Sequence, residues 1–114
     1  MIVDIIFKTN QLRKECNDAK LMRKKHGPER ANRLKRRLDE LRAANNLEEM
    51  RRLPQARLHE LRGDRDGQLS LDLDHPYRLI IEPANNPVPK KPDGGLDWAQ
   101  VTAVLIVEVA DTHG

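Results

Sequence analysis

The chain has 114 residues, a net charge of +3 and a single cysteine, Cys16, so it has room for one modest hydrophobic core and no internal disulfide. No apolar run approaches the roughly 20 residues that span a bilayer. Residues 1–8 also lack the basic and long apolar segments of a secretory signal. We therefore expect one domain over residues 1–114, without membrane association, in a reducing cytoplasm.

Positive and negative charges are divided unevenly along the chain. Residues 1–57 hold 16 lysines and arginines against 8 acidic residues, whereas residues 58–114 hold 5 against 10. A basic half joined to an acidic half predicts a face that meets a polyanion, such as nucleic acid or the ribosome. The alternative is that two helices merely carry solvated basic faces.

The first half of the chain is predicted to form one strand and two helices. Residues 2–8 are an apolar run rich in isoleucine, which is typical of a strand. Apolar residues that recur every three to four positions predict helices over about residues 10–25 and 28–44, separated by a Gly-Pro pair. Residues 47–53 are read as one or two further helical turns. The second helix has the clearest apolar stripe, formed by Ala31, Leu34, Leu38 and Leu41.

In the second half the apolar period changes from 3.6 residues to two, which is typical of strands. The predicted strands cover residues 58–62, 68–74, 77–82 and 98–110. The last of them has apolar residues on both faces and is therefore expected to be central. Residues 83–97 contain four of the seven prolines and are predicted to form a long loop. In the second of these strands the leucines are expected to face the core, and the outward-facing residues to be Gln68, Ser70, Asp72 and Asp74.

The resulting order is β-α-α-β-β-β-β, which predicts an α+β fold. Two N-terminal helices are expected to pack on a five-stranded, mainly antiparallel sheet. The reason is that neither layer can bury its apolar face alone.

Five polar side chains of the second half form a candidate site on what are predicted to be adjacent strands. They supply two imidazoles, two guanidiniums and a carboxylate, a set able to transfer protons and to hold a phosphate in a cleft. These residues are His59, Arg62, Arg78, Asp111 and His113. In the plainer alternative, His59 is a strand histidine bonded to a backbone carbonyl, and the last two are solvated groups at a strand end.

The two arginines of this set also have plainer alternatives. Arg78 would form an ion pair on the sheet face with Asp72 or Glu82, because a charge in a buried-looking strand needs a partner. Arg62 would be a solvated strand end. His59 and Arg62 are three residues apart, so a regular strand points them to opposite faces, and a joint site requires a bulge or a turn between them.

A basic surface is the second functional prediction. Its cations would contact ribosomal RNA phosphates, which position a complex and do not specify sequence; the alternative is a solvated helix face. The cysteine and histidines show no metal-ligand spacing, and no glycine-rich phosphate loop is present, so we expect neither a metal nor a cofactor. The predicted RNA-binding cations are Lys24, Lys25, Arg33, Lys35, Arg36 and Arg37, with Lys90 and Lys91 on the long loop.

Four short segments, in a fixed order and spacing, suggest a family. Residues 53–64 contain Leu58-His-Glu-Leu-Arg-Gly-Asp64, and they are followed by residues 67–71, 77–80 and 109–113. Together these segments resemble the RelE/ParE superfamily of bacterial toxins, and most of all its HigB-like branch, the plasmid maintenance killer proteins. That family typically shows a Leu-His-x-Leu-Lys-Gly-Asp run, an Arg-Leu strand and a C-terminal Asp-Tyr-His.

The resemblance implies a RelE-like fold and the toxin of a type II toxin–antitoxin system. Such a toxin is expected to enter the decoding site of the 70S ribosome and to cut messenger RNA there without a metal ion. A helix-turn-helix antitoxin of the HigA type would neutralise it in a hetero-oligomer. By the same resemblance His59, Asp111 and His113 would share proton transfer, while Arg62 and Arg78 would stabilise the phosphate.

Two positions depart from the family pattern. Arg62 stands where the family has lysine; it can still bind phosphate, but a permanently protonated arginine is a poor general base. Thr112 stands where the family has tyrosine, and a threonine can neither stack on a base nor act as a phenolic acid. These departures keep open the alternative of an inactive binding or regulatory module. A separate alternative is a toxin of the same fold that inhibits DNA gyrase without cutting RNA, a branch that does not need paired histidines near the strands.

Overall fold

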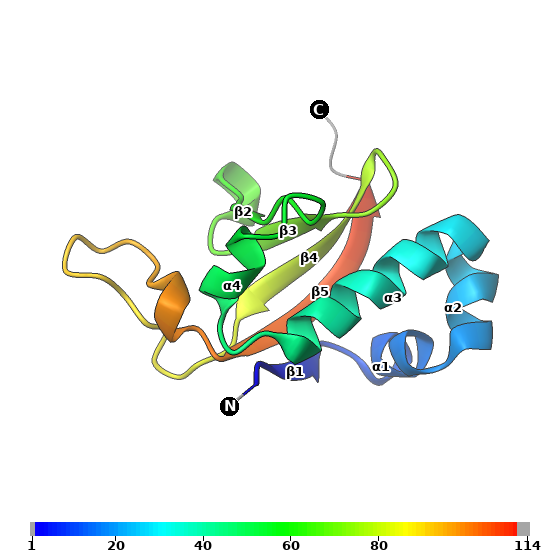
Figure 1. Ribbon diagram of the computed structural model, residues 1–114, viewed down its shortest axis with the longest axis horizontal. Coiled ribbons are helices and arrows are strands. Elements are labelled where there is room, and N and C mark those ends of the chain that lie inside the picture. The colour runs from blue at the N-terminus through cyan, green and yellow to red at the C-terminus, as the bar shows by residue number, and fades with distance from the viewer. Residues whose placement is uncertain (1, 112–114) are drawn as a thin grey trace.

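A five-stranded mixed sheet lies at the centre of the structure, a computed structural model that describes residues 2–111 (Figure 1). Its strands lie in the order β1-β5-β4-β3-β2, with β1 parallel to β5 and all other neighbours antiparallel. The predicted α+β class and the mainly antiparallel sheet are thus confirmed. The strands are β1 (Asp4–Phe7), β2 (His59–Glu60), β3 (Leu69–Asp72), β4 (Tyr77–Pro83) and β5 (Ala103–Asp111).

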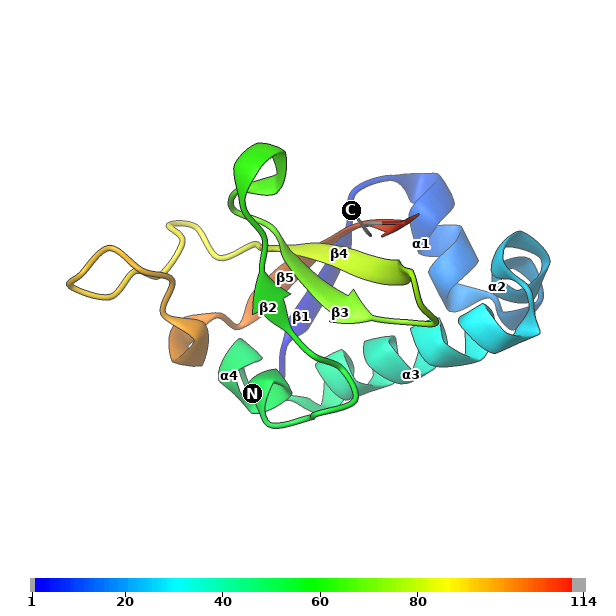
Figure 2. The ribbon, with the colours of Figure 1, turned by 90° about the horizontal axis from the view of Figure 1, so that it is seen from above.

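Helices cover one face of this sheet. Figure 2 shows α3 and α4 along one side of it, whereas α1 and α2 stand at one end of the molecule. Within residues 2–111 no helix is both long and apolar enough to cross a membrane. The helices are α1 (Asn10–Asn17), α2 (Ala19–His26), α3 (Pro28–Ala43) and α4 (Leu47–Arg51), with two short 3-10 helices, η1 (Gly63–Arg65) and η2 (Trp98–Gln100).

The core lies between α3 and the covered face of the sheet. The predicted apolar stripe of α3 is buried along its whole length, and Leu34 and Leu41 are completely inaccessible. Burying one such leucine contributes about 1.5–3 kcal/mol, so this stripe fixes the helix on the sheet. Its partners on the strands include Leu69, Leu71, Leu79, Ile81, Val104 and Ile106.

The helix predicted over residues 10–25 is wrong in one respect, because the chain leaves the helical conformation at Asp18. The Asp18 carboxylate accepts hydrogen bonds from the backbone N–H groups of Lys20 (2.9 Å) and Leu21 (3.2 Å). Asp18 thereby caps the first turn of α2. The N-terminal part therefore contains two short helices where one was predicted.

The strand predictions also need correction. The predicted strand 58–62 is reduced to His59–Glu60, and the predicted strand 98–110 begins only at Ala103, because residues 98–100 form η2. That last strand, β5, is nevertheless central, as predicted. Ser70, which was predicted to face outward, is completely buried.

Candidate active site

Strand pairing brings four polar side chains to one face of the sheet. His59 on β2 lies opposite Ser70 on β3, and Asp72 on β3 lies opposite Arg78 on β4. Directly paired residues of antiparallel strands project from the same face. Ser70 and Asp72, two residues apart, share that face as well. It is the face opposite to the one that packs on α3.

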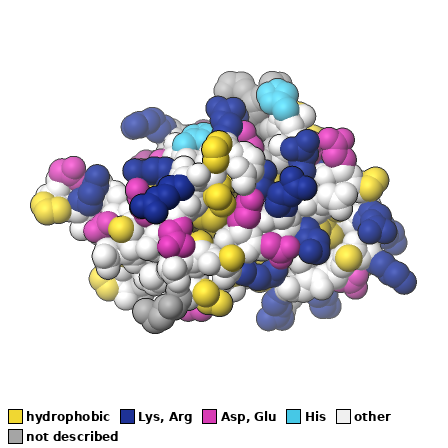
Figure 3. Space-filling model, in the orientation of Figure 1, with side chains coloured by type: hydrophobic (Ala, Val, Ile, Leu, Met, Phe, Trp, Pro, Cys, Tyr) yellow, Lys and Arg dark blue, Asp and Glu magenta, His cyan; other side chains and the backbone are white. Residues whose placement is uncertain are grey.

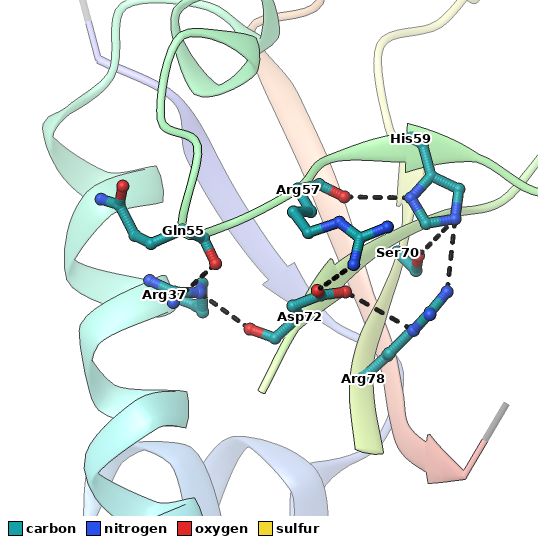
Figure 4. Close-up of polar contacts among 7 residues, drawn as sticks. All are labelled: Arg37, Gln55, Arg57, His59, Ser70, Asp72 and Arg78. Carbon is teal, nitrogen blue, oxygen red and sulfur yellow. Dashed lines mark hydrogen bonds and ion pairs between the residues drawn. The ribbon is translucent and has the colours of Figure 1, made fainter. Parts of the chain in front are cut away.

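The His59 imidazole is contacted at both ring nitrogens (Figure 4). Its Nδ1 atom lies 3.0 Å from the carbonyl oxygen of Arg57. Its Nε2 atom lies 3.3 Å from Ser70 Oγ and 3.3 Å from Arg78 Nη1. The ring itself is half-buried. The contacts at Nε2 are slightly longer than typical hydrogen bonds, so an incoming polar group can replace them at small cost.

Asp72 lies between two guanidinium groups. Its Oδ1 atom is 3.5 Å from Arg78 Nε, and its Oδ2 atom is 3.5 Å from Arg57 Nη1. Oδ1 is buried and accepts no hydrogen bond within residues 2–111. The ion pair that the sequence left open as an alternative for Arg78 is therefore present. A cavity of about 40 Å³ adjoins the three side chains.

Arg37 of α3 fastens the segment before β2 to the sheet. The residue is only 2% exposed. It donates from Nε to the Asp72 carbonyl (2.9 Å), from Nη2 to the Gln55 carbonyl (3.1 Å) and from Nη1 to Glu40 Oε1 (2.7 Å) (Figure 4). The prediction that Arg37 binds RNA is wrong, because its side chain is buried and its donors face protein acceptors.

The same segment carries an unusual backbone conformation at Arg57. Its φ of 45° makes it the one non-glycine residue with positive φ within residues 2–111. Such a conformation costs about 1–3 kcal/mol and persists only where the surroundings hold it. Here the preceding residue is fixed, because the Asp72 N–H donates to the Ala56 carbonyl at 2.7 Å.

Three of the predicted site residues do not join this cluster in the described structure. Arg62 is exposed at the start of η1, and within residues 2–111 its side chain makes no hydrogen bond or ion pair. Asp111 is paired with Tyr77, one residue before Arg78, so the alternation along β4 places it on the opposite face. His113 lies outside the described residues.

A second polar network continues along the same face. Arg65 Nη1 donates to Gln68 Oε1 (3.0 Å) and to Glu108 Oε2 (3.2 Å), and Gln68 Nε2 donates to Glu82 Oε2 (2.9 Å). Glu82 was the other ion-pair partner considered for Arg78, but within the described chain its carboxylate accepts the hydrogen bond from Gln68 and does not contact Arg78. The face therefore carries a mixture of charges and no continuous positive surface.

Sequence reasoning missed two members of the cluster, Arg57 and Ser70, and it treated Asp72 only as an ion-pair partner. The sequence did contain a signal for Ser70 and Asp72, because the alternation in residues 68–74 placed both side chains on the same side of one strand. No pattern pointed to Arg57, because its contribution depends on a backbone carbonyl and a positive φ.

The predicted RNA-binding cations occupy two separate places. Figure 3 shows lysines and arginines gathered over the end of the molecule that α1, α2 and the start of α3 form. Lys24 on α2 and Arg36 in the middle of α3 are exposed and make no ion pair within the described chain. Lys35 is paired with Asp39 at 3.1 Å, and Lys25 and Arg33 lie 3.8 and 3.6 Å from Glu15 and Glu29. Lys90 and Lys91 belong to the long loop at the opposite end of the molecule (Figure 1).

Burial shifts the pKa values of two titratable groups that lie away from the cluster. Burial, together with the neighbouring Glu15 carboxylate, raises the pKa of the Cys16 thiol to about 11. Burial also lowers the pKa of the His26 imidazole below its ordinary value. Among residues 2–111 no three histidine, cysteine, aspartate or glutamate side chains are grouped so that they could hold a metal ion.

Comparison with known proteins gives one family. The family model described as the RelE-like toxin of the type II toxin–antitoxin system HigB matches residues 5–91. No curated protein matches the chain. The matched range includes β2, β3 and β4, and therefore all the residues of the cluster around His59.

Proposed function

Because the chain belongs to the HigB-like family of RelE-like toxins of type II toxin–antitoxin systems, we propose that it is a ribosome-dependent endoribonuclease. It would cut messenger RNA in the decoding site. The observation that carries the proposal is the contact of 3.3 Å between His59 Nε2 and Arg78 Nη1. It joins a group able to accept a proton to a group able to bind a phosphate.

The proposed reaction uses the ribose 2′-hydroxyl as nucleophile. His59 Nε2 accepts the 2′-hydroxyl proton while the oxygen attacks the adjacent phosphorus. Arg78 donates hydrogen bonds to the phosphoryl oxygens as negative charge develops on them. The bond from phosphorus to the 5′-oxygen then breaks, leaving a 2′,3′-cyclic phosphate and a 5′-hydroxyl. Neither step requires a metal ion.

The leaving 5′-oxygen needs a proton from a second group. We keep His113 for this step, as the resemblance implies, with Asp111 as the carboxylate that orients it. Asp111 lies on the face of the sheet opposite to His59 and Arg78, so it is not proposed to touch the substrate. Arg62 is exposed at the start of η1 and is proposed to contact the phosphate backbone from there. These three assignments rest on the sequence, whereas those of His59 and Arg78 rest also on their mutual contact.

Substrate binding is expected to rearrange the cluster. In the structure Arg78 Nη1 occupies one side of His59 Nε2, and Asp72 faces Arg78 Nε. A phosphate is a stronger partner for a guanidinium than a neutral imidazole is, because both groups are charged. Phosphate binding would therefore draw Arg78 Nη1 away from Nε2 and open that atom to the 2′-hydroxyl.

The partners follow from the family and the surface. A type II toxin has a protein antitoxin as its partner; we propose a HigA-like helix-turn-helix protein in a hetero-oligomer, with residues 1–114 as a single toxin domain. Exposed Lys24 and Arg36 on α2 and α3, with their paired neighbours, would contact ribosomal RNA phosphates.

Primer extension on a messenger RNA in a translating extract tests the proposal. Wild type is expected to cut within codons, and His59→Ala and Arg78→Ala are expected to cut at least about 100-fold more slowly. Arg65→Ala is the matched control, because Arg65 is an ion-paired arginine on the same face, 3.2 Å from Glu108. Thermal unfolding of each variant checks that it is folded.

The outcomes separate the competing functions. If His59→Ala and Arg78→Ala cut as fast as Arg65→Ala, the site assignment fails. Intact messenger RNA together with double-strand DNA breaks in expressing cells would identify a gyrase inhibitor. Growth that strong induction leaves unaffected would identify an inactive binding module.

A further inference from the structure

The backbone carbonyl of Arg57 faces the Nδ1 atom of His59 at 3.0 Å. A carbonyl oxygen only accepts hydrogen bonds, so this contact requires a proton on Nδ1. At the other nitrogen, Arg78 Nη1 lies 3.3 Å from Nε2, and a guanidinium only donates. The neutral ring protonated on Nδ1 satisfies both neighbours at once. In the other neutral tautomer, the lone pair of Nδ1 would face the carbonyl oxygen, and the N–H of Nε2 would face an N–H of the guanidinium. Neither pair could form a hydrogen bond.

We infer that the Arg57 carbonyl is a positioning group that fixes His59 as the Nδ1–H tautomer and so leaves the lone pair on Nε2. The Ser70 hydroxyl, 3.3 Å from Nε2, can donate to the same lone pair. All three contacts of the ring then agree with one protonation state. The main chain of one residue decides which nitrogen can accept a proton.

The surroundings of Arg57 hold this carbonyl in place. The φ of 45° turns the main chain into a conformation that a side-chain-bearing residue rarely adopts. The Asp72 N–H donates to the Ala56 carbonyl at 2.7 Å and so fixes the main chain directly before Arg57. The 3.5 Å contact of Asp72 with the Arg57 guanidinium involves a side chain that is 67% exposed and adds little. Arg37 binds the Gln55 carbonyl at 3.1 Å. Residues 55–57 are thus attached to β3 and α3 one after another.

The Asp72 carboxylate lies between the two arginines that contact the His59 ring. Asp72 is 3.5 Å from the guanidinium of Arg57, whose carbonyl contacts Nδ1, and 3.5 Å from that of Arg78, which contacts Nε2. Under the proposed nuclease function, on which this step rests, the fixed tautomer presents Nε2 as the base for the 2′-hydroxyl. The tautomer itself is a property of the folded protein and does not depend on that function.

Nitrogen NMR of the wild-type protein labelled with ¹⁵N-histidine decides the tautomer without any substrate. The two ring nitrogens of a neutral histidine resonate far apart according to which one carries the proton, and His59→Gln identifies the His59 signals by their loss. We expect protonated Nδ1 and unprotonated Nε2 at a pH where the ring is neutral. A protonated Nε2, or an equal mixture, overturns the inference.

Two substitutions then separate the carbonyl from the side chain. Arg57→Gly removes the guanidinium but keeps the carbonyl and tolerates positive φ, so the Nδ1–H tautomer should remain. Arg57→Pro fixes φ near about −65° and turns the carbonyl away. In that variant the Nδ1–H preference should disappear and cleavage should fall by about 100-fold. The amide spectrum of each variant reports whether its core is intact.

The results distinguish failure of the inference from failure of the proposed function. If wild type cuts no messenger RNA but shows the Nδ1–H tautomer, the nuclease proposal fails and the positioning by Arg57 stands. If a folded Arg57→Pro keeps the tautomer, or Arg57→Gly loses it, the carbonyl does not set it. If Arg57→Pro does not fold, the wild-type and Arg57→Gly spectra still decide.

Discussion

Replacing Arg37 by methionine tests how strongly α3 holds the candidate site. Methionine keeps an unbranched aliphatic chain in the core but removes the donors to the Asp72 carbonyl, the Gln55 carbonyl and Glu40. A hydrogen bond from a charged donor contributes about 1.5–3 kcal/mol. The three bonds share one guanidinium and do not add, so the cost of breaking a buried ion pair, about 3–5 kcal/mol, is the better measure.

We therefore expect the free energy of unfolding of Arg37→Met to fall by about 3–5 kcal/mol. Small domains are stable by about 5–15 kcal/mol in total, so the variant should lose a large part of its stability. Urea unfolding followed by circular dichroism measures the change. The expected effect extends to the site, because two of the three lost bonds hold the carbonyl of Gln55, in the segment that leads to His59, and the carbonyl of Asp72, whose side chain contacts Arg78.

Arg36→Met is the matched control, because Arg36 is the exposed neighbour on the same helix and makes no ion pair within the described chain. Its free energy of unfolding should change by less than about 0.5 kcal/mol. Equal urea midpoints for Arg36→Met and Arg37→Met would refute the reasoning and would show that the buried guanidinium holds nothing in place.

Two further predictions concern the helices. Burial raises the pKa of Cys16 to about 11, and only the thiolate reacts. Iodoacetamide at pH 8 should therefore modify the folded protein at least about 100-fold more slowly than the urea-unfolded chain. Because the thiol of the unfolded chain ionises first, the free energy of unfolding should fall as pH rises from 9.0 towards about 11, and Cys16→Ala should lack this fall. Asp18→Ala should lower the free energy of unfolding by about 1 kcal/mol through loss of the α2 cap, whereas Asp18→Asn should keep most of it; equal losses in the two variants would contradict a capping role.

The periodicity of the sequence was enough to predict the layers of the fold. The apolar stripe of α3 is buried as expected, and β5 is central as its two apolar faces indicated. The break at Asp18 was missed because apolar residues on both sides of it keep the spacing of a continuous helix. A capping aspartate within an amphipathic segment looks like any other residue of the polar face.

The residue types of the candidate site could be proposed from the sequence, but the strand register that brings them together could not. His59 and Arg78 were both singled out, yet their contact depends on which residues of β2, β3 and β4 stand opposite one another. A shift by one residue would have sent either side chain to the other face. The same alternation explains why Arg62, three residues from His59, stays outside the cluster, since η1 does not turn its side chain back.

The basic half of the chain is less free than its charge suggests. Arg30 and Arg37 are seven residues apart on α3, which places both on the flank of the apolar stripe and turns both towards the sheet. Arg30 binds the Asp74 carboxylate at 3.0 Å, and its guanidinium lies 3.4 Å from the centre of the Tyr77 ring. Arg37 binds the Asp72 carbonyl in a similar way. The helical period thus separates cations that hold the β3–β4 end from those, such as Arg36, that point away from it. Only the latter remain available to a polyanion, so the docking surface is smaller than a count of lysines and arginines implies.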